Sequence, residues 1–250
     1  MSQNEMTIYE HIGELRKRLI IIVVFFVLAV VASFFLSQPL IKLIQQADAA
    51  KELTMNAFRV TDPFKVYMQM TFVLALVMTS PVILYQLWAF ISPGLMEKER
   101  KVTLGYIPIS ALLFLAGVAF SYFILFPFVI EFMLGLSGNM DIKTTIGINE
   151  YFQFLFQITI PFGLLFQLPV VMLFLTRLGI VTPMFLAEIR KYAYFVLLVI
   201  AAFITPPDLV SHMMVTVPLL ILYEISIWIS RIGYRKAQKA EAEAAQESQG

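Results

Sequence analysis

Residues 66–96 read VYMQMTFVLALVMTSPVILYQLWAFISPGLM, a stretch without a charged side chain. A helix rises about 1.5 Å per residue and the hydrocarbon core of a bilayer is about 30 Å thick, so this stretch is long enough to cross a membrane. The composition agrees, because 60% of the 250 residues are hydrophobic and 14% are charged. Since about a quarter of the residues of a soluble domain are charged, the sequence argues against a single water-soluble globule.

Three further stretches are long and apolar enough to cross, and a nearly continuous apolar run follows them. Thr205-Pro206-Pro207-Asp208 interrupts this run and predicts a tight hairpin, since two prolines and an acid end a helix. We therefore expect an all-α integral membrane protein with six transmembrane helices. The fifth is short, so it should lie in thinned membrane or leave part of the bilayer uncovered. The expected spans cover about residues 19–41, 66–90, 104–130, 151–176, 192–206 and 209–230.

The chain is expected to form one membrane domain, residues 1–235, and a disordered cytoplasmic tail, residues 236–250, which is rich in Ala, Glu and Gln. With six crossings the two termini share a side. By the positive-inside rule that side is cytoplasmic, because it collects thirteen of the 18 Lys and Arg residues. These are Arg16, Lys17, Arg18, Lys98, Arg100, Lys101, Arg177, Arg190, Lys191, Arg231, Arg235, Lys236 and Lys239.

Composition also limits the chemistry. The chain has no cysteine and two histidines, His11 and His212, so neither a thiolate nor a histidine cluster can hold a metal. Its formal net charge of +1 argues against nucleic acid as a partner. No Ser/His/Asp set or pair of catalytic carboxylates is visible, so we expect neither an enzyme nor a cofactor.

Two Pro-containing segments predict helix starts. Asp62-Pro63 follows a polar loop and predicts a helix with Asp62 as its cap and Pro63 as its first residue, and Thr182-Pro183 predicts a short helix in the same way. At the N-terminus, apolar residues recur at helical spacing and predict an amphipathic helix that runs into the first span.

Two carboxylates at the predicted cytoplasmic face differ in their charged helical neighbours. Glu14 has Lys17 and Arg18 within helical reach, so a simple intrahelical pair accounts for it. Glu99 has no charged helical neighbour, whereas Glu97 has Lys101 at i+4. Taken alone, Glu14 and Glu99 are still more typical of solvated surface charge than of a site.

The strongly polar residues within the spans form a second group. An ionisable residue inside a membrane is a functional hypothesis by default, and Glu224 is the strongest example. Glu224 also lies near the cytoplasmic end of its span, so its side chain reaching the interface accounts for it equally well. Prolines and polar residues in the fourth span leave open a secondary transporter for a small solute, although no internal repeat supports it. The group comprises Gln157, Gln167, His212 and Glu224.

Several stretches, in this order, resemble the TatC family of twin-arginine protein translocases. They are HIGELRKRL (11–19), SPVILYQLWAFISPGL (80–95), EKER (97–100), FP (126–127) and TPPD (205–208). The resemblance implies six helices in a concave, glove-like arrangement, in the bacterial cytoplasmic membrane. It also implies a receptor that binds Arg-Arg signal peptides of folded precursor proteins at the cytoplasmic face.

The same resemblance implies partners and site residues. It implies recruitment of TatA-type single-span subunits for export driven by the proton-motive force, and a homo-oligomer within the complex; whether a separate TatB-type subunit takes part stays open. For signal recognition it carries over Glu14, Arg16, Phe90 and Glu99, with Pro93 shaping the loop. Candidates for partner docking or for polar roles in the membrane are Gln167, Asp208, His212 and Glu224.

The chain departs from the family pattern at two of these positions. Gln167 stands where many relatives carry a glutamate, and Gln can neither take up a proton nor hold a charge. His212 stands where some relatives have Gln, so a pH-sensing role for this histidine stays open.

Overall fold

A computed structural model gives the structure of the chain and describes residues 8–47, 53–92, 103–139, 145–206 and 208–247. It forms two compact units. The first contains Met1–Ala111 and Thr145–Gln153, and the second contains Leu112–Thr144 and Phe154–Gly250. Within the described residues the architecture is helical apart from one two-stranded bridge.

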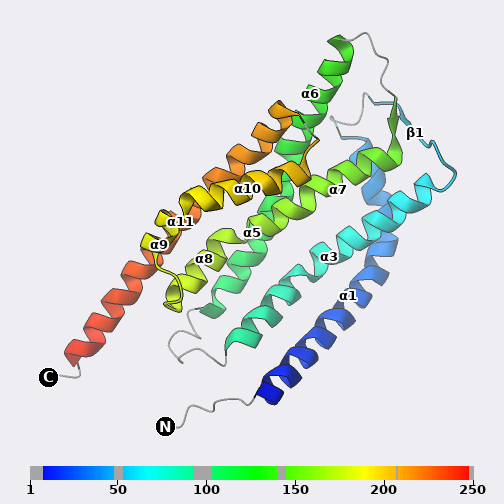
Figure 1. Cartoon of the computed structure of the whole chain (residues 1–250). Coiled ribbons are helices and arrows are strands. Elements are labelled where there is room, and N and C mark those ends of the chain that lie inside the picture. Colours follow the sequence, from blue (N-terminus) through cyan, green and yellow to red (C-terminus); the bar gives the residue numbers. More distant parts are fainter. Residues whose placement is uncertain (1–7, 48–52, 93–102, 140–144, 207, 248–250) are drawn as a thin grey trace. The chain divides into compact units, whose positions relative to one another are not determined.

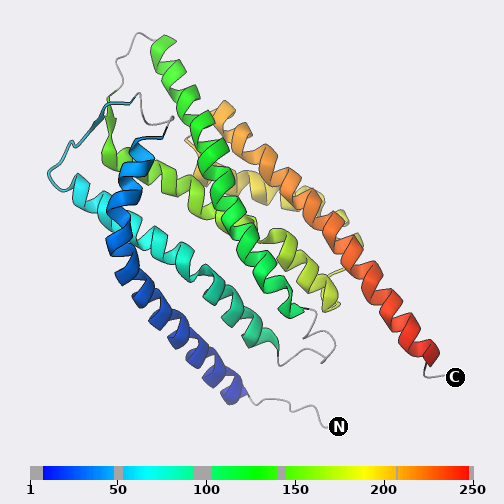
Figure 2. The same cartoon turned by 180° about the vertical axis from the view of Figure 1, so that it is seen from behind.

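The first unit is built on two long helices, α1 (Ile8–Gln45) and α3 (Asp62–Ile91), which lie side by side in Figures 1 and 2. The amphipathic segment and the first span are one helix, as predicted. Small polar residues join the two helices: Ser37 Oγ lies 2.9 Å from Thr71 Oγ1, and both residues are buried. Such pairs stabilise helix contacts in lipid, where no water competes for the hydroxyls.

A short bridge closes the end of this unit. β1 (Met55–Asn56) pairs in parallel with β2 (Ile146–Gly147), with Met55 opposite Ile146. The prediction that a helix starts beside Pro63 is confirmed, but Asp62 as its cap is wrong. Asp62 already belongs to α3, and its buried Oδ2 accepts the N–H of Arg59 at 2.8 Å. The carboxylate therefore closes the preceding turn instead of capping the helix.

The second unit contains a span with a π-helical turn. The span runs through α5 (Tyr106–Phe120), η2 (Ser121–Leu125) and α6 (Phe126–Asn139), with the α5 part before Leu112 belonging to the first unit. The N–H of Phe126 bonds to the carbonyl of Ser121, five residues earlier. Pro127 follows directly and has no N–H to donate, which favours a local change in the hydrogen-bond ladder.

The fourth apolar stretch is broken, as its prolines suggest. Two residues separate α7 (Ile148–Leu165) from α8 (Leu168–Arg177), and α8 has Pro169 in its first turn. Gly179 then ends α8 with φ +68°, a left-handed conformation that glycine adopts without steric cost.

The remaining helices of the second unit are α9 (Pro183–Glu188), α10 (Arg190–Ile204) and α11 (Leu209–Glu247). The predicted start at Thr182 is confirmed, since its Oγ1 accepts the N–H of Phe185 at 3.2 Å. The predicted break between the last two helices is confirmed too. α11 continues to Glu247, and the Ala, Glu, Lys and Gln residues of this end are strong helix formers. A disordered tail from residue 236 stays a prediction, as does the domain division.

Five helical segments have the length and apolar composition to cross a membrane: Ile12–Gln45, Asp62–Ile91, Tyr106–Ser137, Ile148–Arg177 and Leu209–Arg235. The all-α membrane class is therefore confirmed. α10 has only 15 residues and is not among these five segments. It is short, as expected for the fifth span, while the count of six crossings stays a prediction.

Candidate functional site

The first turns of α1 meet the last turns of α3, and a chain of polar contacts joins them. Oε1 of Glu14 accepts a hydrogen bond from Nε of Arg18 at 3.2 Å and forms an ion pair with its Nη2. Nη1 of Arg18 then donates to Oε1 of the buried Gln86, at 3.3 Å. The predicted intrahelical pair of Glu14 is thus present, and Arg18 also bridges to α3.

This contact uses only one carboxylate oxygen of Glu14. The other oxygen, Oε2, is buried and has no hydrogen-bond partner among the described residues. A buried carboxylate oxygen without a donor is costly, so Oε2 is a ready acceptor for an incoming N–H group.

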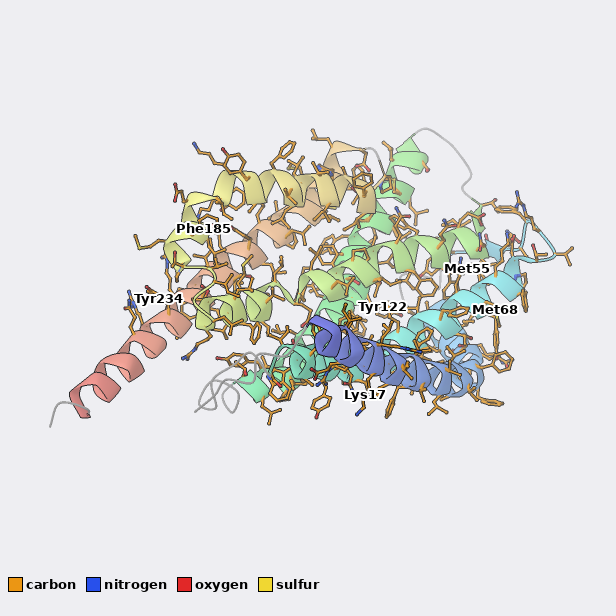
Figure 3. All side chains as sticks on the ribbon, turned by 60° about the horizontal axis from the view of Figure 1, so that its bottom comes forward. Lys17, Met55, Met68, Tyr122, Phe185 and Tyr234 are labelled. Atoms are coloured by element: carbon orange, nitrogen blue, oxygen red, sulfur yellow. The ribbon has the colours of Figure 1, made fainter. Side chains whose placement is uncertain are left out.

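A cavity of about 520 Å³ opens beside this network. It combines the carboxylate with apolar and aromatic surface, which suits a ligand that is both cationic and apolar. Figure 3 shows Lys17 on the same helix. The lining residues are Gly13, Glu14, Lys17, Arg18, Ile21, Tyr85 and Gln86.

The other residues predicted for signal recognition divide into two groups. Arg16 is exposed on α1, and Phe90 is half-buried on α3, one turn after Gln86. Pro93 and Glu99 lie outside the described residues. Described residues on either side of this stretch are in contact: Nε1 of Trp88 donates to Oγ1 of the buried Thr103 at 3.1 Å.

The intramembrane polar residues of the second unit lie on several elements. Gln167 is buried at the break between α7 and α8. Asp208 caps α11 by accepting the N–H of Ser211 at 2.7 Å, and His212 lies one turn further along. Gln157 donates from α7 to the carbonyl of Phe203 near the end of α10, at 3.2 Å.

Glu224 has partners of its own. Its Oε1 accepts a hydrogen bond from the Tyr194 hydroxyl at 2.5 Å. It also lies 2.9 Å from Nε of Arg190, a contact that is an ion pair without hydrogen-bond geometry. These contacts support the simpler interpretation of Glu224, a half-exposed carboxylate paired near the end of its expected span rather than an isolated charge in the membrane.

If this pairing is structural, Arg190→Gln and Glu224→Gln should each remove the same interaction, so their losses of stability should not add. Each single variant is expected to lower the melting temperature slightly, and the double variant should lose less than the sum. The overlap should correspond to about 0.5–1 kcal/mol, because both side chains are partly solvated. Thermal unfolding of the four proteins in detergent measures it. Strictly additive losses would contradict the pairing and favour a separate role for Glu224.

Comparison with known proteins decides the family. The family model described as "Sec-independent protein translocase protein (TatC)" matches residues 10–218. The chain belongs to the TatC family. It is 67% identical over 242 residues to the Sec-independent protein translocase protein TatCy of Bacillus subtilis strain 168, covering 97% of this chain and 95% of that one. It is 62% identical over 241 residues to TatC of Halalkalibacterium halodurans, covering 96% of this chain and 95% of the relative.

A solved structure agrees with this assignment. A crystal structure described as the twin-arginine translocase receptor TatC matches with a TM-score of 0.80 at 31% identity, covering 89% of this chain and 99% of that one. This TatC protein is therefore a membrane-embedded, multi-pass component of the twin-arginine protein translocase. Because the chain belongs to the TatC family, the alternative function that the intramembrane polar residues left open, transport of a small solute, is set aside.

Sequence reasoning missed two members of the α1–α3 contact of TatC. Gln86 was part of the motif but had no distinguishing signal, because a lone glutamine in a span is commonly a packing residue. Tyr85 was equally unmarked. The Glu14–Arg18 spacing and the motifs that resemble the family pointed to this end of the first unit in advance, but not to the role of these two residues.

Proposed function

We propose that this TatC protein is the receptor subunit that binds the paired arginines of twin-arginine signal peptides, with Glu14 accepting one of them. The observation that carries this proposal is the buried, unpartnered Oε2 of Glu14 beside a cavity of about 520 Å³. A guanidinium presents parallel N–H groups to a carboxylate, and such charge-assisted bonds are among the strongest that side chains make.

The existing contacts of Glu14 suit this role. Arg18 holds Oε1 and is itself held by Gln86, so the carboxylate is oriented before a ligand arrives. Pre-orientation reduces the entropy cost of binding. A lysine is a compact charge without the planar fork, so it should be a poorer ligand than arginine.

Glu99 is proposed as the acceptor for the second arginine. It is four residues from Thr103, which the hydrogen bond from Trp88 fixes at the end of α3. Two carboxylates match two adjacent arginines, with Arg16, Phe90 and Pro93 as further members of the proposed surface.

The wider setting is also part of the proposal. The distribution of Lys and Arg supports cytoplasmic termini, with the signal site facing the cytoplasm of a bacterium. Recruitment of TatA-type subunits, with or without a TatB-type protein, assembly of several copies in the complex, and the absence of enzymatic activity complete the proposed function. Within the described residues no group of three or more His, Cys, Asp or Glu side chains could hold a metal ion.

The direct test compares an Arg-Arg signal peptide with its Lys-Lys counterpart on purified wild type, Glu99→Ala and Glu97→Ala. Wild type and Glu97→Ala are expected to prefer Arg-Arg, and Glu99→Ala to lose much of that preference, because the i+4 spacing of Lys101 predicts a local partner for Glu97 and none for Glu99. Fluorescence anisotropy of labelled peptides measures the affinities. Equal effects of the two alanine variants would contradict the role of Glu99.

A further inference from the structure

Residues 178–192, which join α8 to α10 and include the first residues of α10, carry an apolar surface that no described part of the protein covers. Four large side chains are exposed on it: two belong to the short helix α9, one precedes this helix and one follows it. The exposed fractions of these side chains are high for large apolar residues, and that of Met184 is the highest of the four. They are Ile180 (67%), Met184 (81%), Phe185 (50%) and Tyr192 (75%).

Specific contacts hold this surface in place. Gly179 turns the chain sharply after α8, and Thr182 caps α9. Leu186 is buried, and its carbonyl accepts the hydroxyl of Tyr223 on α11 at 2.9 Å. Because α9 is fixed through its inner side, the outer side chains are presented outward rather than folded back.

The position of the turn places it at a membrane surface. It connects α8, the end of the membrane-crossing segment Ile148–Arg177, with the apolar helix α10. α9 has only six residues and cannot cross. Tyr192 and the exposed Trp228 of α11 are residues typical of the boundary between headgroups and acyl chains.

The charges around the turn are mostly positive. Within residues 177–192 and 224–235 the acidic residues are Glu188 and Glu224, and Glu224 is paired with Arg190. Nε of Arg177 is buried without a hydrogen-bond partner in the described part of the chain, next to Gly233 of α11. Figure 3 shows Phe185 on α9 and Tyr234 on α11 at the same end of the second unit. The basic residues are Arg177, Arg190, Lys191, Arg231 and Arg235.

We propose that residues 178–192 form an interfacial docking surface for anionic phospholipids. Ile180, Met184 and Phe185 enter the boundary between headgroups and acyl chains, while the phosphates face the basic residues around them. Apolar insertion and attraction of basic residues to anionic lipids reinforce each other in this geometry. The surface is separate from the Glu14 cavity, which belongs to the other unit.

The absence of cysteine makes a clean experiment available, because one introduced thiol can be labelled alone. Full-length Met184→Cys and the control Glu188→Cys, both exposed positions of α9, are labelled with a polarity-sensitive fluorophore and placed in lipid nanodiscs. The Met184 label should emit as in an apolar medium and be quenched by nitroxide on shallow acyl carbons. The Glu188 label should report water.

Lipid selectivity is measured with the same Met184→Cys protein. Nitroxide-labelled phosphatidylglycerol should quench at least about twofold more than nitroxide-labelled phosphatidylcholine at equal fraction. Combined Lys191→Gln, Arg231→Gln and Arg235→Gln changes should abolish that difference while the melting temperature stays unchanged. A Met184 label that reports water in every bilayer, equal quenching by both lipids, or shielding only when a TatA-type protein is added would each overturn the proposal.

Discussion

Glu14→Gln is expected to weaken binding of an Arg-Arg signal peptide by about ten- to a hundredfold. The substitution keeps the size of the side chain but removes the charge that faces the incoming guanidinium. Hydrogen bonds to charged groups contribute about 1.5–3 kcal/mol when shielded from water, which corresponds to this range. Anisotropy titrations of purified protein with labelled peptide measure the change.

Lys17→Gln is the matched control for this prediction. Lys17 lines the same cavity and lies one turn from Glu14, but its charge has the opposite sign. Removing a positive charge beside an arginine site should leave the affinity unchanged or raise it slightly. If both variants weaken binding equally, the cavity responds to general disturbance, and Glu14 has no special role as acceptor.

The second large effect is expected on stability, at the contact of Gly117 in α5 with Phe162 of α7 within the second unit. A Cβ added at Gly117 would lie 2.7 Å from the carbonyl oxygen of Phe162 and 2.8 Å from Cγ of Phe166. Gly117→Ala therefore forces the backbones apart. Overpacking of this kind costs about 1–3 kcal/mol, so the melting temperature should fall by several degrees.

Gly135→Ala provides the comparison for this change. Gly135 lies in α6, and a Cβ there would meet nothing within 4 Å. Alanine is the better helix former by about 1 kcal/mol, so this variant should be as stable as wild type or more so. Thermal unfolding followed by circular dichroism in detergent tests both. Equal melting temperatures for the two variants would show that the close approach at Gly117 does not limit packing.

Local features of this protein could be predicted from sequence because their causes lie within a few residues. Charge-free length marked the long spans, and Pro206 and its neighbours marked the break before α11. The helix start at Thr182 needed only the hydroxyl and the following proline. In each case the signal and the structure share one stretch of chain.

Contacts between distant residues could not be predicted in this way. The partners of Glu224, Arg190 and Tyr194, were not visible in the sequence because they lie 30 or more residues away. Gln86 gained its meaning only when α3 was placed against Arg18. The role of Asp62 was predicted wrongly because its carboxylate can accept a backbone N–H from either the following helix or the preceding turn. In the structure it accepts the N–H of Arg59, in the preceding turn.

The hydrogen bond between Trp88 and Thr103 has a consequence for how a paired signal is selected. It ties Thr103 to the last turns of α3, and under the proposed function the second arginine would meet Glu99 without a new diffusional encounter once Glu14 holds the first. Short tethers of this kind give effective concentrations in the millimolar range. Two adjacent arginines then gain avidity that a single arginine cannot reach, and a protein bearing scattered arginines fails to compete at the same site.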